Sequence, residues 1–161
     1  MKTNRLVLTS LLLLLPLLCQ AQKNKVSIFE KYSEMNHVSS IYISKAMIDM
    51  MTDFQADDIN ISKIAKQLNR IEILSTDNAT IKKSMKKDID ELTDYYYELM
   101  MKQKGQTSSM AFYSWTQKGK IISFIVLIDA PNTLKYIRLD GNMNLKDIQN
   151  IISQQNSSLN K

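Results

Sequence analysis

The stretch that decides the fold is SMAFYSWTQKGKIISFIVLID, residues 109–129. Two runs rich in β-branched and aromatic residues, 109–116 and 121–129, flank the polar residues 117–120. Within that gap, Lys118 and Gly119 predict a two-residue hairpin turn, because glycine readily adopts the positive φ that such turns need. We therefore expect two antiparallel strands joined directly at this point.

Both faces of the predicted hairpin are apolar. The simplest register places Trp115 opposite Ile122 and Tyr113 opposite Phe124, so that Tyr113, Trp115 and Phe124 share one face. An antiparallel sheet with one wet face alternates apolar and polar residues instead. Either helices cover both faces of this hairpin, or one face meets a partner. We expect a central position in the sheet, with helices on one face and partial cover on the other.

Outside the hairpin, three further segments have strand character: 38–43, 70–75 and 133–139. Together with the hairpin they predict a five-stranded, mostly antiparallel sheet. Short helices are expected at 27–34, after the N-cap residue Ser44, and over 61–68.

A longer helix is predicted over about 78–104. Its apolar residues recur in steps of three or four: Ile81, Met85, Ile89, Leu92, Tyr96 and Leu99. Gly105 follows at the position of a C-terminal cap. A terminal helix is expected to bury Leu145, Ile148, Ile151 and Ile152. These elements predict a two-layer α+β domain in which the long and terminal helices pack on the sheet.

The segment 138–148, RLDGNMNLKDI, is rich in oxygen-bearing side chains and invites comparison with a calcium loop. An EF-hand needs glycine at its sixth position and glutamate at its twelfth, where this chain has Leu145 and Ile151. A structural corner accounts for the residues better. Asp140 and Gly141 are expected to end the strand with a turn, and Asn144 and Asp147 to cap the terminal helix.

The N-terminus is typical of a secretory signal peptide. Lys2 and Arg5 precede an apolar run over 6–18, which is shorter than a membrane span. Small residues follow, and we expect cleavage between Ala21 and Gln22. The mature protein would be a single exported, periplasmic domain over 22–161 with a polar tail at 154–161.

Cys19 offers an alternative, a membrane-anchored lipoprotein. Lipoprotein cleavage needs a small residue before the modified cysteine, and Leu18 is large. A lipid on Cys19 would hold the protein to a membrane surface. Without it, no membrane contact is expected.

The composition excludes several function classes. Removal of the signal lowers the formal net charge from +5 to +3, which does not suggest a nucleic-acid partner. The mature chain has one histidine, His37, and no cysteine, so the usual zinc ligand sets are missing. No nucleophile elbow or glycine-rich phosphate loop is present. We expect no catalytic residue, no metal and no cofactor, and therefore not an enzyme.

Three stretches carry a family resemblance: 28–51, 68–78 and 118–148. With them the chain resembles the domain-of-unknown-function family 4252, small exported proteins found mainly in Bacteroidetes. The resemblance implies an exported α+β domain without an assigned activity or family catalytic residues. Members of such families are often lipoproteins, and Leu18 departs from that pattern.

A possible partner surface consists of aromatic residues. In the predicted long helix Tyr96 is buried, so that Tyr95 and Tyr97 point to either side. With Tyr113 and Trp115 of the hairpin they form a candidate contact surface. We therefore expect a non-enzymatic interaction or regulatory module of the cell envelope, with an envelope protein as partner.

The alternative is a small-ligand-binding protein. It would need a cavity between the sheet and the long helix, lined by residues such as Met85, Ile89 and Phe112.

Overall fold

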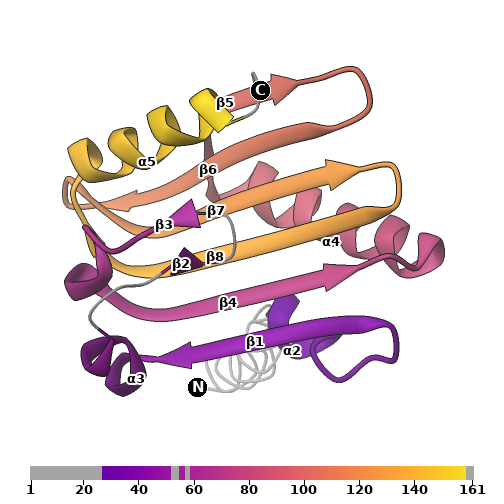
Figure 1. Cartoon of the computed structure of the whole chain (residues 1–161), viewed down its shortest axis with the longest axis horizontal. Helices are drawn as coiled ribbons and strands as arrows, with labels where there is room; N and C mark the ends of the chain where they lie inside the picture. The colour runs from indigo at the N-terminus through magenta and orange to yellow at the C-terminus, as the bar shows by residue number, and fades with distance from the viewer. Residues whose placement is uncertain (1–26, 52–54, 57–58, 159–161) are drawn as a thin grey trace, which may run out of the picture.

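The computed structural model describes residues 27–51, 55–56 and 59–158. Its centre is a six-stranded antiparallel sheet in the order β1-β4-β8-β7-β6-β5 (Figure 1). The strands are β1 Val38–Ser44, β4 Leu68–Thr76, β5 Glu98–Lys104, β6 Ser109–Gln117, β7 Lys120–Ala130 and β8 Thr133–Met143. A small separate ladder pairs β2 (Gln55–Ala56) with β3 (Ile59–Asn60). The predicted α+β class and antiparallel sheet are confirmed, with six strands in place of five.

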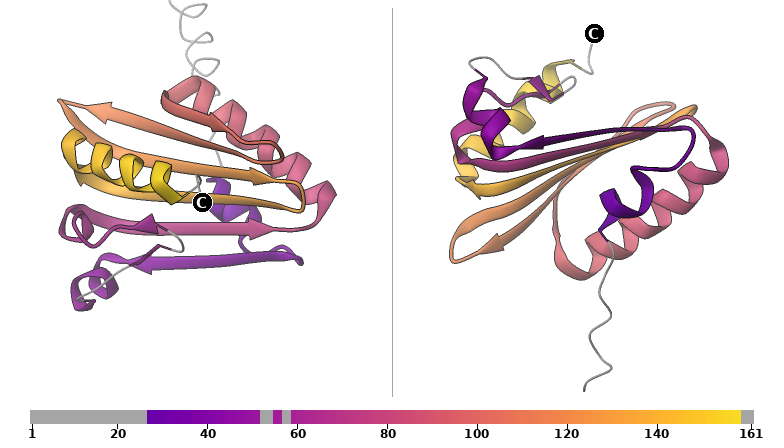
Figure 2. Two further views of the ribbon diagram at one scale, coloured as in Figure 1. Left: turned by 45° about the horizontal axis from the view of Figure 1, so that its top comes forward. Right: turned by 90° about the horizontal axis from the view of Figure 1, so that it is seen from below.

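Helices lie on both faces of the sheet (Figure 2). One face carries α2 (Ile28–Tyr32) and α4 (Ala79–Tyr96), and the other carries α3 (Lys45–Met50) and α5 (Leu145–Ser158). Two separate apolar cores result, one around Met85 and Tyr136 and the other around Phe112 and Ile148. The expected helical layer is therefore divided between the two faces, which explains why the hairpin is apolar on both sides.

The predicted long helix is too long. Helix α4 ends at Tyr96, and residues 98–104 form the edge strand β5, which pairs with β6. Met100 and Met101 of this strand pack against the core on the α5 side of the sheet. Backbone pairing with β6 thus overrides the helical spacing that continues to Leu99. Gly105 is not a helix cap but lies between β5 and β6, where its N–H donates to the carbonyl of Ser108 at 2.8 Å.

The hairpin turn is confirmed, but its register is not. Lys118 and Gly119 both have positive φ, 49° and 75°, as a two-residue turn requires. A bulge next to Trp115 then shifts the pairing by one residue, so that Trp115 pairs with Ser123. Because a one-residue slip exchanges the faces of a strand, Phe124 lies on the opposite face from Tyr113 and Trp115.

The expected helix over 61–68 is also wrong. The segment forms a turn and the short 3₁₀ helix η2 (Ala65–Gln67), and Leu68 begins β4. The apolar residues of this segment are nevertheless buried. Their spacing therefore predicted burial correctly and the local geometry incorrectly.

Strand β8 does not turn at Asp140 and Gly141 but continues to Met143. Gly141 pairs with Leu68, and a Cβ there would lie 2.1 Å from the carbonyl oxygen of Gln67. The glycine is therefore needed for the close approach of two backbones. Asn144 precedes α5 as expected, but Gln67 completes the corner. Its side chain accepts from the Asn144 N–H at 3.0 Å and donates to the Asp147 carboxylate at 2.7 Å.

We expect Gly141→Ala to lower the free energy of unfolding by about 1–3 kcal/mol, because the added methyl group meets backbone atoms rather than a movable side chain. Gly105→Ala is the matched control, since a Cβ at that site makes only ordinary contacts, 3.5 Å or longer. It should change stability by less than about 0.5 kcal/mol. Urea unfolding of both variants measures the difference, and equal effects would refute the close approach.

Candidate functional site

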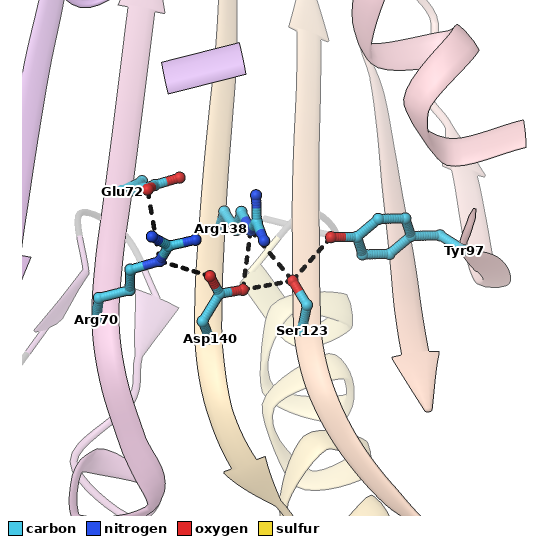
Figure 3. A network of polar contacts seen from close by, with 6 residues as sticks. All are labelled: Arg70, Glu72, Tyr97, Ser123, Arg138 and Asp140. Carbon is cyan, nitrogen blue, oxygen red and sulfur yellow. Dashed lines mark hydrogen bonds and ion pairs between the residues drawn. The ribbon is translucent and has the colours of Figure 1, made fainter. Parts of the chain in front are cut away.

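A cluster of polar side chains lies on the α4 face of the sheet, next to the area that α2 and α4 cover (Figure 3). Its members, here called the Asp140 cluster, are Arg70, Glu72, Tyr97, Ser123, Arg138 and Asp140. The Asp140 carboxylate accepts from Arg70 Nε at 2.6 Å, Arg138 Nε at 2.8 Å and Ser123 Oγ at 2.5 Å. It thereby joins the three neighbouring strands β4, β8 and β7.

The Asp140 cluster extends to the end of α4 through Ser123. The Ser123 hydroxyl lies 2.8 Å from the hydroxyl of Tyr97, the residue between α4 and β5. Burial raises the pKa of Tyr97, so its hydroxyl stays protonated at neutral pH. The cluster therefore fixes the point at which the chain leaves the helix and enters the edge strand.

Glu72 is the less satisfied carboxyl of the cluster. Glu72 on β4 lies opposite Arg138 on β8 in the strand register and is only 3% exposed. Its Oε1 lies 3.5 Å from Arg70 Nε, and its Oε2 has no hydrogen-bond partner among the described residues. Burial raises the pKa of Glu72, against the lowering effect of Arg70 and Arg138. The neighbouring Tyr136 hydroxyl, also buried, likewise lacks a partner in the described part of the chain.

A cavity of about 540 Å³ opens beside this cluster, between α2, α4 and β8. It is lined by Ser27, Ile28, Lys31, Asp88, Glu91, Leu92 and Arg138. Asp88 ties its two helical walls together by accepting from Lys31 Nζ at 2.5 Å and Tyr32 Oη at 2.6 Å. Burial acts to raise the pKa of Asp88, but these two hydrogen bonds hold it below its usual value. We call this hollow the Arg138 cavity.

Four aromatic rings gather where α4 ends, and we call them the aromatic cluster: Tyr95, Tyr96, Tyr97 and Trp115. Ring centroids are separated by 4.5 Å for Tyr95–Tyr96, 5.9 Å for Tyr96–Trp115 and 6.1 Å for Tyr97–Trp115. Tyr95 is 75% exposed and Tyr96 41% exposed, whereas Tyr97 and Trp115 are half-buried. The rings form one continuous surface between helix and sheet.

The structure brings together three of the four predicted partner residues. Tyr95, Tyr97 and Trp115 belong to the aromatic cluster, whereas Tyr113 packs against the core under α4. The prediction that Tyr96 is buried is wrong, because α4 ends at this residue and leaves its ring beside Trp115. The predicted cleavage residues Ala21 and Gln22 lie outside the described residues.

The cavity predicted beside Met85, Ile89 and Phe112 does not lie there. Met85 and Ile89 are fully buried in the core, and Phe112 is on the opposite face of the sheet. The Asp140 cluster was missed altogether. A usable signal was present, because Arg70 and Glu72, like Arg138 and Asp140, are charged residues two apart in apolar strands and must share one face.

Within the described ranges, no three histidine, cysteine or acidic side chains gather as a metal site would require. No helix in the same part of the chain is both long and apolar enough to span a bilayer.

The sequence comparison identifies the family. A family model described as Domain of unknown function (DUF4252) matches residues 32–151. The chain belongs to this family. The DUF4252 match contains the complete Asp140 cluster and aromatic cluster, while the α2 residues that line the Arg138 cavity lie just before it. A search of curated proteins finds no match to the chain.

Asp88 should contribute acid-sensitive stability. Its folded pKa is lowered, so its contribution is complete above about pH 4 and is lost as the pH falls through the folded pKa. We expect Asp88→Asn to cost about 1–3 kcal/mol at pH 7. The difference from the unmodified protein should shrink toward pH 2.

Asp90→Asn is the control, because the Asp90 carboxylate lies as far as 3.7 Å from Lys86 Nζ and both side chains are more than 40% exposed. It should cost less than about 0.5 kcal/mol at either pH. Urea unfolding at pH 7 and pH 3 measures both variants. A pH-independent difference for Asp88→Asn would contradict the assignment.

Proposed function

We propose that this DUF4252 protein is an exported, non-enzymatic interaction module of the cell envelope, and that the aromatic cluster binds its partner protein. The observation that carries the proposal is the continuous, partly exposed surface of Tyr95, Tyr96 and Trp115. Tyrosine and tryptophan are enriched at interfaces, where they bury a large area at little cost in conformational entropy. Leu99, 50% exposed on the adjoining edge strand, extends this surface.

The charges around the aromatic cluster indicate what kind of partner it binds. Helix α4 carries Lys82 and Lys83 among its first five residues, whereas acids lie at its other end, with Asp94 in the last turn and Glu98 just beyond it. This order opposes the helix dipole, which favours acids at the start and bases at the end. Asp94 and Glu98, which form an acidic rim at this end of the helix, therefore do not stabilise the helix through its dipole. It suits a partner segment that presents apolar side chains together with lysine or arginine, which also interact favourably with tyrosine rings.

Export is proposed from the N-terminal sequence. The order of charged, apolar and small residues over 1–21 is that of a signal peptide, and the periplasm is the corresponding location. Lipid attachment through Cys19 is the alternative, and it would place the same domain on a membrane surface.

At Asp94, the proposal predicts opposite effects on helix stability and on partner binding. We expect Asp94→Lys to stabilise α4 by about 0.3–1 kcal/mol, because a positive charge then lies at the C-terminal end of the helix. The same change should weaken partner binding by charge repulsion. Tyr95→Ala should weaken binding about tenfold or more, since it removes an exposed ring of the cluster.

The partner is first captured in the native host with a photoreactive residue at position 95, and its affinity for each purified variant is then measured. Position 50 serves as the control, because Met50 is 80% exposed but lies on α3, on the other face of the sheet. Crosslinks that form from position 50 and not from position 95 would overturn the proposal. So would an Asp94→Lys protein that binds the captured partner as tightly as before.

A further inference from the structure

Arg138 presents unused hydrogen-bond donors to the Arg138 cavity. Its Nε donates both to Asp140 Oδ1, at 2.8 Å, and to Ser123 Oγ, at 3.2 Å. Among the described residues these are the hydrogen bonds of its guanidinium, and the residue lines the cavity. A guanidinium carries five N–H donors. The two terminal amino groups are therefore the donors that Arg138 can offer to a bound molecule.

One more polar group at the cavity lacks a partner. Ser27 lines the cavity, and its buried Oγ has no hydrogen-bond partner among the described residues. Glu72 Oε2 and the Tyr136 hydroxyl, both beside Arg138 in the sheet, also lack partners in the described part of the chain, but neither residue lines the cavity. Buried polar side chains without partners are uncommon in folded proteins. The unpartnered Ser27 hydroxyl and the unused donors of Arg138 therefore indicate that a ligand with hydrogen-bond acceptors completes the hydrogen bonding inside the cavity.

The walls of the cavity limit the charge of that ligand. Asp88 is already paired with Lys31 and Tyr32, and Glu91 lies 3.8 Å from Lys87. These two acids disfavour a dianion such as phosphate. One guanidinium fork suits a single carboxylate, which can accept two parallel hydrogen bonds. Ile28 and Leu92 supply apolar wall beside it.

We propose that the Arg138 cavity binds a small monocarboxylate that carries an apolar group. The carboxylate accepts hydrogen bonds from the terminal amino groups of Arg138, and the apolar group packs against Ile28 and Leu92. A volume of about 540 Å³ lies within the range of small-molecule sites. Both the C-terminal residue of a peptide and a short fatty acid have this chemistry. The site shares no residue with the aromatic cluster, so either binding proposal can fail alone.

Two matched pairs of probes test the proposal by calorimetric titration of the purified chain. N-acetyl-leucine is compared with N-acetyl-leucinamide, and octanoate with octanol, so that only the carboxylate differs within each pair. We expect at least one acid to bind at least tenfold more tightly than its neutral partner. The pair that binds distinguishes a peptide end from a fatty acid. Equal binding within both pairs, binding of inorganic phosphate instead, or no binding at all would overturn the proposal.

Variants then locate the bound carboxylate. Arg138→Lys keeps the charge and removes the fork, and we expect it to weaken binding of the acid about tenfold. Arg70→Lys is the matched control. Like Arg138, Arg70 donates to the carboxylate of Asp140, at 2.6 Å, but it does not line the cavity. Because both arginines share Asp140, Arg70→Lys should affect binding indirectly, and its loss of affinity should be clearly smaller than that of Arg138→Lys. Equal losses in both variants would assign the effect to the cluster as a whole and overturn direct contact with Arg138. Leu92→Ala, at the apolar wall, should weaken the binding of the acid and of its neutral partner by the same factor.

Discussion

The arrangement of the α4 face depends on one carboxylate, Asp140, which two arginines and a serine from neighbouring strands share. Two partly buried guanidinium groups without a counter-ion would be strongly destabilising. A buried ion cluster of this kind adds little net stability over apolar packing, but its geometry is specific. Here it fixes the direction of Arg138 toward the cavity and, through Ser123, the position of Tyr97 beside Trp115. Both proposed binding surfaces are therefore attached to the same cluster.

The second constraint is that the sheet is apolar on both faces. The α3 and α5 face is closed by apolar residues, while α2 and α4 close only part of the other. Because α4 ends at Tyr96, the remaining area of that face holds charged residues, and its border holds exposed rings. The length of α4 thus decides where charged residues and aromatic rings remain uncovered on this face.

Local chemistry accounts for what the sequence predicts correctly. The Lys118-Gly119 turn, the N-cap Ser44 and the terminal helix each follow from short-range preferences, and all three appear in the structure. The errors come from contacts between distant residues. Pairing with β6 converts the end of the predicted helix into β5, and a bulge at Trp115 exchanges the faces of Phe124. No short-range pattern contains that information.

The same reason applies to the site. The sequence predicts Tyr95, Tyr97, Tyr113 and Trp115 as a contact surface, but it places the two helical tyrosines inside a helix that continues to 104, and Tyr113 packs against the core instead. The Asp140 cluster needs the pairing of β4, β8 and β7, because Arg70 and Asp140 are 70 residues apart. Charged residues in alternation along apolar strands indicate such a cluster, but they do not say which strands meet.

The most direct measurement is the fluorescence of Trp115, the only tryptophan of the chain, in the Ser123→Ala protein. This change breaks the link between Asp140 and Tyr97 and leaves both arginine pairs in place. Ser114→Ala is the control, since Ser114 is also buried but lies on the opposite face of the sheet. If Asp140 positions the aromatic cluster, acrylamide should quench Trp115 more strongly in Ser123→Ala than in the control or the unmodified protein. Unchanged quenching in a folded Ser123→Ala protein would contradict that dependence.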